Sequence, residues 1–227
     1  MSKATWTFRE SATGESGDIE LCLEQGADAL ASLTLAFDIG LREPRAWYHV
    51  GCVVHAARPL QLFQRRRTLQ LGNDLTGASE LASIRWHRAG LDETAQLEIL
   101  SLLLAEAVRR ARTARPDSPL IVELPGVRDA QGLPPFWQGL GQCFYGGDLA
   151  LQGPRWRSWV AALLPRQPVY ACFLPESAQA VIGVAGEGAQ LLAEALELQG
   201  FAPDGHVDIV DGGPVYALPA QRLQRRA

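Results

Sequence analysis

Histidine and cysteine are the side chains that most readily bind transition metals or act as nucleophiles and acid–base groups, and this sequence holds four of each. The histidines do not fall on one helical face, so the pattern argues against a metal site: His49, His55, His87 and His206. The cysteines lie far apart without C-x-x-C spacing, so we expect four buried thiols in a reducing compartment: Cys22, Cys52, Cys143 and Cys172.

Short catalytic motifs are also missing from the sequence. It contains no G-x-x-x-x-G-K-[ST], no G-x-S-x-G, no H-E-x-x-H and no G-x-G-x-x-G that opens a helix. General motifs therefore assign no reaction to the chain.

Composition limits the class of protein. The 227 residues are 47% hydrophobic and 20% charged, which is ordinary for a folded chain that buries a core without disulfides or metals. A net charge of −4 and a pI near 5.6 argue against a nucleic-acid partner. There is no apolar run of 18 residues, and the first residues are polar, so we expect no membrane span, no signal peptide and a cytoplasmic protein.

The elements that must position any site begin with strands. After a turn-rich segment at 11–18, alternating or continuous apolar residues predict strands at 19–23, 33–39, 48–56, 68–71 and 80–86. An arginine run at 65–67 separates two of these predicted strands.

A long helix is the clearest element of the second half, at 93–112. Asp92 can cap it, arginines occupy its last turn and Pro116 follows its end. Beyond it the pattern predicts a buried strand at 120–124, a loop, a short helix at 136–143, a helix at 189–199 closed by Gly200, and a strand at 207–210. Strands followed by a strand–helix–strand passage predict a mixed α/β or α+β fold, which we assign to one domain over 1–227.

Six blocks of sequence go further than these patterns. Residues 69–81 read L-Q-L-G-N-D-L-T-G-A-S-E-L, and further distinctive blocks occupy 51–56, 126–141, 164–170, 176–183 and 207–214. In the same order, these resemble motifs of the bacterial arginine N-succinyltransferases, such as "LxNDxTGxSEL", "GVxDxxGxSPFWxxLG" and "VDIFDGGP". The resemblance spans about 33–214.

The resemblance implies a GNAT-type acyltransferase fold, a bent mixed sheet flanked by helices. In that fold acyl-CoA lies in a V-shaped split between two parallel strands, here 80–86 and 120–124, with 93–112 as the crossover helix. The implied reaction transfers succinyl from succinyl-CoA to the α-amine of arginine during arginine catabolism. Succinyl-CoA is then a co-substrate, and neither a metal nor a permanently bound cofactor is expected.

The resemblance also suggests site residues. Glu80 and His55 are the catalytic candidates, and Asn73 and Asp74 are the substrate-binding candidates. Contact with CoA is expected from four residues of the strand and loop that precede the crossover helix: Ser83, Ile84, Arg88 and Gly90. A turn-forming Asn-Asp pair and satisfied core polar groups are equally good explanations of the first four residues.

Three departures from the family affect the chemistry. The family's glycine-rich CoA loop is here His87-Arg88-Ala89-Gly90-Leu91-Asp92-Glu93, with one glycine and two acidic residues where a pyrophosphate would bind. The family's proton-donor histidine, three residues after V-I-G, is replaced by Gly186. The chain is also shorter than the family's enzymes, and we expect it to lack part of their N-terminal and C-terminal regions.

Two hypotheses remain open. One is an active or weakened arginine N-succinyltransferase. The other is a non-catalytic paralogue that acts as a partner subunit or ligand-binding module of a longer homologue. Both fit a homo-oligomer or a hetero-oligomer with such a homologue, because the missing N-terminal region leaves surface to be covered.

Overall fold

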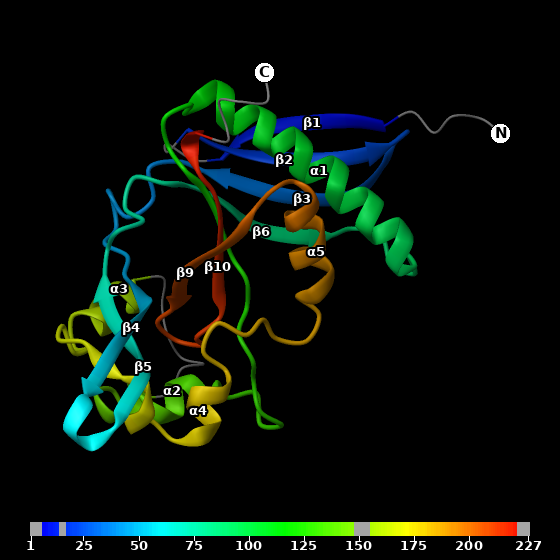
Figure 1. Cartoon of the computed structure of the whole chain (residues 1–227). Coiled ribbons are helices and arrows are strands. Elements are labelled where there is room, and N and C mark those ends of the chain that lie inside the picture. Colours follow the sequence, from blue (N-terminus) through cyan, green and yellow to red (C-terminus); the bar gives the residue numbers. More distant parts are fainter. Residues whose placement is uncertain (1–5, 14–16, 148–154, 222–227) are drawn as a thin grey trace.

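A mixed β-sheet runs through the whole protein in the computed structural model, which describes residues 6–13, 17–147 and 155–221. Within these residues the strand order is β1-β2-β3-β6-β7-β10-β9-β4-β5-β8, and every neighbouring pair is antiparallel except the parallel pair β6–β7 (Figure 1). The strand bounds are β1 Trp6–Thr13, β2 Asp18–Gln25, β3 Asp28–Ala36, β4 Trp47–Ala57, β5 Leu62–Gly72, β6 Ser79–Trp86, β7 Leu120–Glu123, β8 Val169–Tyr170, β9 Ala202–Asp208 and β10 Pro214–Leu218.

The long helix α1 (Glu93–Ala114) connects the parallel strands and confirms the predicted crossover. Asp92 caps it by accepting a hydrogen bond from the backbone N–H of Ala95 at 2.8 Å. The helix ends before Arg115 because the residue that precedes a proline is driven out of the helical region. Beside it lies α5 (Gln190–Leu198), followed by Gly200 with a left-handed φ of +89°, which agrees with the predicted C-terminal glycine (Figure 1).

The first core lies between these two helices and one face of the sheet. Along β7, Leu120 and Val122 face this core, while Ile121 faces a small second cluster on the other side with Trp47 and Val215. This alternation is the two-residue period of a strand buried on both faces.

The other half of the sheet has its own core. The helices α2 (Pro135–Gly139), α3 (Trp156–Ala161) and α4 (Glu176–Ala180) lie near β4 and β5 (Figure 1). Phe136, Trp137 and Trp156 pack there, and Tyr48 of β4 contacts Phe136 edge-on with ring centroids 6.0 Å apart. The sheet is therefore covered by different helices at its two ends.

Several predictions about individual segments were wrong. The arginine run at 65–67 does not separate strands but lies inside β5, where the hairpin leaves it exposed to water. Cys22 is the one buried cysteine, while Cys52, Cys143 and Cys172 are exposed. Residues 11–13, expected in a turn, belong to β1, and β10 was not expected as a strand.

Candidate functional site

A cleft opens between the parallel strands β6 and β7. They pair only at Ser79–Leu120 and Glu80–Ile121 and then separate. The cavity between them has a volume of about 280 Å³, and its walls come from β6, β7, α1 and the start of α5: Leu81, Ala82, Ser83, Ile84, Trp86, Leu100, Val122, Glu123, Pro125, Gly188, Leu191 and Leu192. Most of these side chains are apolar, and Glu123 is the ionisable one.

A β-bulge shapes the β6 wall of this cleft. Ser32 of β3 is opposite Arg85 and Thr34 is opposite Ala82. Two β6 residues, Ser83 and Ile84, therefore lie opposite the single β3 residue at position 33. Ser83 has a left-handed φ of +52°. A bulge of this kind removes backbone groups from the regular ladder of hydrogen bonds, which leaves them available to a ligand beside the strand.

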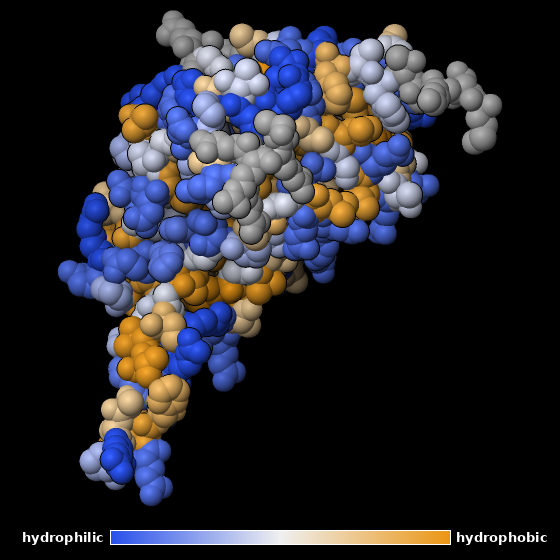
Figure 2. Space-filling view, turned by 45° about the horizontal axis from the view of Figure 1, so that its top comes forward, coloured by the Kyte–Doolittle hydropathy of each residue, from blue (hydrophilic) through white to orange (hydrophobic). Residues whose placement is uncertain are grey.

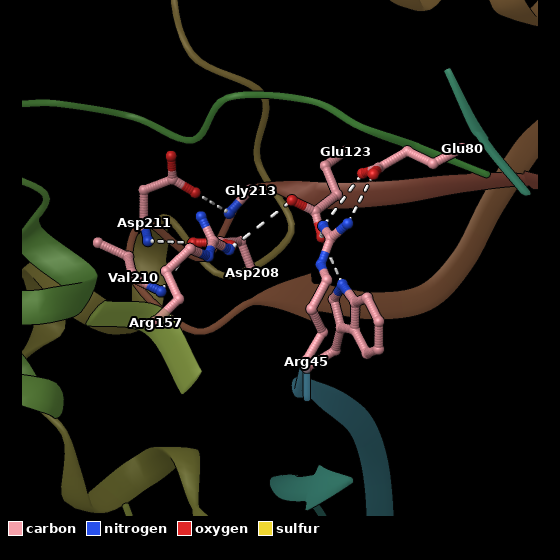
Figure 3. A network of polar contacts seen from close by, with 9 residues as sticks. Arg45, Glu80, Glu123, Arg157, Asp208, Val210, Asp211 and Gly213 are labelled. Atoms are coloured by element: carbon pink, nitrogen blue, oxygen red, sulfur yellow. Dashed lines mark hydrogen bonds and ion pairs between the residues drawn. The ribbon is translucent and has the colours of Figure 1, made fainter. Parts of the chain in front are cut away.

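A partly buried ion-pair network lies next to the cleft (Figure 3). The Arg45 guanidinium donates to both oxygens of Glu80, at 2.6 and 3.0 Å, and to Glu123 Oε1 at 2.7 Å. The Trp47 indole N–H donates to the same Glu123 oxygen at 2.5 Å, and its ring lies 5.2 Å from the Arg45 guanidinium carbon. This is a complete guanidinium site, with two carboxylates and an aromatic face, and it is filled by the chain's own arginine.

Burial and charge act in opposite directions in this network. Burial raises the pKa of Glu80, while hydrogen bonds from Arg45 counteract part of that shift. Burial disfavours the charge of Arg45, but the carboxylates of Glu123 and Glu80 outweigh it and raise the pKa of Arg45 above its ordinary value. The guanidinium therefore stays charged and holds both carboxylates in place.

The network continues to the turn between β9 and β10. Arg157 of α3 forms an ion pair with Asp208 and lies 3.7 Å from Glu123 Oε2 (Figure 3). Asp208 Oδ1 accepts from the backbone N–H of Val210 at 2.7 Å and Asp211 at 3.0 Å. The D-G-G-P turn of the sequence is thus built around a buried carboxylate.

The structure places the expected site residues in different regions. Ser83 and Ile84 line the cleft, and Glu80 lies beside it with both oxygens paired to Arg45. His55 lies on the exposed end of β4, where its ring is 5.6 Å from that of Tyr170. It is not part of the network around Glu80.

The other candidates lie outside the cleft. Asp74 lines a separate cavity of about 400 Å³ together with Ala78 and Pro119, where β6 and β7 begin rather than where they diverge. Its carboxylate lies 3.5 Å from His206 Nε2. Asn73 lines a third cavity with Arg45. The structure therefore does not bring the Asn-Asp pair to the cleft.

The loop before α1 holds the last two candidates. Arg88 donates to the side chain of Gln25 at 3.2 Å, and Gly90 adopts a left-handed φ of +76° with open space around it. At the N-terminus of α1, the Asp92 carboxylate already accepts a hydrogen bond from one of the backbone N–H groups that have no partner within the helix.

Four residues of the network were not expected from the sequence: Arg45, Trp47, Glu123 and Arg157. Glu123 did carry a signal, because it is the one charged residue in the otherwise apolar run L-I-V-E-L at 120–124. Arg45 and Arg157 carried none, since each meets its partners only through the fold. Within the described residues no group of side chains has the arrangement of a metal site, and no helix is long and apolar enough to cross a membrane.

Comparison with known proteins identifies the scaffold that carries this cleft. Residues 8–225 match the family model described as "Arginine N-succinyltransferase beta subunit". The chain belongs to the arginine N-succinyltransferase family. This confirms the resemblance seen in the six sequence blocks.

Curated members of the arginine N-succinyltransferase family align with almost the whole chain. "Arginine N-succinyltransferase subunit beta" of Pseudomonas aeruginosa is 34% identical over 99% of this chain and 67% of the relative. "Arginine N-succinyltransferase" of Salmonella paratyphi B is 33% identical over 96% of this chain and 60% of the relative. The chain therefore spans about two thirds or less of these relatives' length.

A solved structure supports the same assignment. The arginine/ornithine succinyltransferase subunit AI from Pseudomonas aeruginosa superposes with a TM-score of 0.69 at 28% identity, over 92% of this chain and 62% of that one. This confirms the predicted mixed α/β acyltransferase fold.

One departure from the arginine N-succinyltransferase family has a clear structural setting. The position that the resemblance assigns to a proton-donor histidine is Gly186, whose N–H donates to the Pro125 carbonyl at 2.8 Å. A Cβ at this position would lie 2.4 Å from the carbonyl oxygen of Gly126. Backbone atoms of the segment at Gly126 occupy the space that a side chain at this position would need, so no histidine fits here without a backbone shift.

Proposed function

We propose that this chain binds succinyl-CoA in the β6–β7 cleft and transfers the succinyl group to the α-amine of arginine or a closely related amino acid. The observation that carries the proposal is the divergence of two parallel strands beside a bulge at Ser83, within a chain of this family. The apolar walls suit the thioester arm of acyl-CoA, and the bulge offers backbone N–H groups to its carbonyl oxygen.

In the proposed reaction the unprotonated amine attacks the thioester carbonyl carbon. A C–N bond forms, the C–S bond breaks, and CoA leaves as a thiolate that takes up the proton lost by the amine. Donors at the bulge would stabilise the negative charge on the carbonyl oxygen. With Gly186 at the family's proton-donor position, we expect turnover about 10²–10⁴-fold below that of an enzyme with a general acid.

Glu123 is the residue that we propose to orient the acceptor amine. It lines the cleft, and its Oε1 is fixed by Arg45 and Trp47. Among the described residues its Oε2 pairs with Arg157 alone, at 3.7 Å, so it can accept a hydrogen bond from an incoming amine. We infer that Glu80 acts as a positioning residue, because both of its oxygens already bind Arg45.

A second candidate function is acyl-CoA binding without transfer, as a partner subunit. The backbone around Gly186, which leaves no room for a proton-donating side chain, favours it. Both functions need the cleft and differ only in chemistry, so binding and thiol release must be measured separately.

The test is calorimetric titration of succinyl-CoA, with and without arginine, followed by detection of released thiol. We expect a dissociation constant below about 100 μM, or roughly −5.5 kcal/mol. Ala82→Phe, which fills the cleft, should weaken binding more than tenfold, while Ser83→Ala keeps the backbone N–H and should bind normally. Binding without thiol release would select the second candidate, and no binding under either condition would overturn both.

A further inference from the structure

The β4–β5 hairpin extends beyond the rest of the sheet. β4 pairs with β9 only at Trp47–His49, and β5 pairs with β8 only at Thr68 and Leu69. Residues 50–67 therefore form a two-stranded ribbon, closed by the 3₁₀ turn η2 (Arg58–Leu60), which we term the arm. It projects at the lower left of Figure 1 and again in Figure 2.

Both faces of the arm expose apolar side chains. Val53 and Leu62 share one face, and Val54 and Phe63 share the other. Phe63 is 70% exposed and Leu60, in the η2 turn, is 76% exposed. In Figure 2 this projection carries hydrophobic residues among hydrophilic ones. A free hairpin with two such faces is marginally stable in water, and exposed apolar patches of this kind usually mark a contact surface.

The arm also carries a strong positive charge. It contains no acidic residue and four arginines: Arg58, Arg65, Arg66 and Arg67. Subtracting these charges from the chain's net charge of −4 leaves −8 on the remaining residues. No carboxylate of the described residues pairs with them; Arg66 binds the Gln64 side chain and Arg67 binds the Gln179 carbonyl.

A complementary surface lies on the same chain but away from the arm. Glu187, just before α5, and Glu194, on α5, are exposed and have no cationic partner among the described residues. Leu198 at the end of α5 is 60% exposed. We term this acidic surface with its apolar residue the α5 face. Figure 1 shows the arm at the lower left and α5 to the right of the centre, beyond β9 and β10, so one chain cannot bring them together.

We propose that the arm docks on the α5 face of a second copy of this chain, in a reciprocal exchange that forms a dimer. Phe63 would be buried beside Leu198, and Arg65 and Arg67, which share its face of the arm, would meet Glu187 and Glu194. Reciprocal docking uses both surfaces of each copy, as a two-fold interface requires. The proposal goes beyond the proposed function and does not depend on it.

The first test is the mass of the purified chain at micromolar concentration, by sedimentation or light scattering. We expect a dimer that weakens as salt is added, because exposed ion pairs are screened. Phe63→Ser should shift the chain to monomer with an unchanged circular dichroism spectrum. Leu41→Ser, at an equally exposed leucine outside both surfaces, should remain a dimer.

A charge-exchange experiment tests the two surfaces together. Arg65→Glu/Arg67→Glu and Glu187→Arg/Glu194→Arg should each be monomeric, since each variant places like charges at both contacts. An equimolar mixture should form a heterodimer, because each reversed arm then meets a reversed face and each native arm a native face. A monomeric wild type, a dimer that survives Phe63→Ser, a mixture that fails to associate, or a chain that assembles only with a longer homologue would overturn the proposal.

Discussion

Arg45 and Glu80 form a two-point ion pair, at 2.6 and 3.0 Å, although their segments belong to distant parts of the sheet. Arg45 precedes β4, Glu80 lies in β6, and three strands separate β4 from β6 in the sheet order. Glu80 is only 7% exposed. The pair therefore ties the half of the sheet that carries the arm to the half that carries the cleft.

Removing the cation from this pair should be severely destabilising. Arg45→Met leaves the carboxylates of Glu80 and Glu123 buried without their guanidinium, and we expect a loss of about 3–5 kcal/mol in the free energy of unfolding. Arg9→Met is the matched control, because Arg9 pairs with Glu24 at the surface; its loss should stay below about 1 kcal/mol. Urea denaturation measures both.

The same variant has a definite pH dependence. Burial already raises the pKa of Glu80, and without Arg45 only the weaker attraction of Arg157 offsets that burial, so the folded state binds a proton there more readily than the unfolded state. A carboxyl group with a raised pKa makes the fold more stable as pH falls. The deficit of Arg45→Met should therefore shrink between neutral and acidic pH. A constant deficit would show that the lost interaction is not the one with Glu80.

The loop before α1 should respond to a change in charge. Asp92→Ser keeps a good N-cap residue but removes a negative charge from the helix N-terminus, where the family resemblance places the CoA pyrophosphate. We expect succinyl-CoA affinity to rise about two- to fivefold with little change in stability. Calorimetry should show no gain for Asp28→Ser, an exposed carboxylate at the start of β3. Equal gains in both variants would mean that net charge, rather than this position, governs binding.

Sequence patterns predicted the elements that are determined by interactions between residues close together in the chain. The β6–α1–β7 passage was predictable because alternation, a capping aspartate and a proline act within a few residues. The six sequence blocks then placed the cleft. The network around Arg45 was not predictable, because a guanidinium finds carboxylates far along the chain only after folding. The predictions for Cys52 and Arg65 were wrong for another reason: the arm is β-strand without a core to cover it.

Acid should weaken the loop that follows Gly126. Backbone N–H groups of Leu133 and Gln131, with the side chain of Gln138, donate to Asp129 and lower its pKa below the ordinary value. A carboxylate with a lowered pKa contributes stability that is present at neutral pH and lost as the pH falls below about 4. The difference in unfolding free energy between wild type and Asp129→Asn should therefore be larger at neutral pH than in acid. An identical difference at both would contradict the assignment, and the exposed Asp28→Asn serves as control.

Gly186 should tolerate no side chain. A Cβ there would lie 2.4 Å from the Gly126 carbonyl oxygen, whereas a Cβ at Gly146 meets nothing within 4 Å. We expect Gly186→Ala to lower the free energy of unfolding by about 1–3 kcal/mol and Gly146→Ala to change it by less than about 0.5 kcal/mol. For the same reason Gly186→His, which restores the family's residue type, should destabilise the fold without raising thiol release from succinyl-CoA. A stable Gly186→His variant with faster turnover would show that the backbone at Gly126 can move aside and that this position still accepts a proton donor.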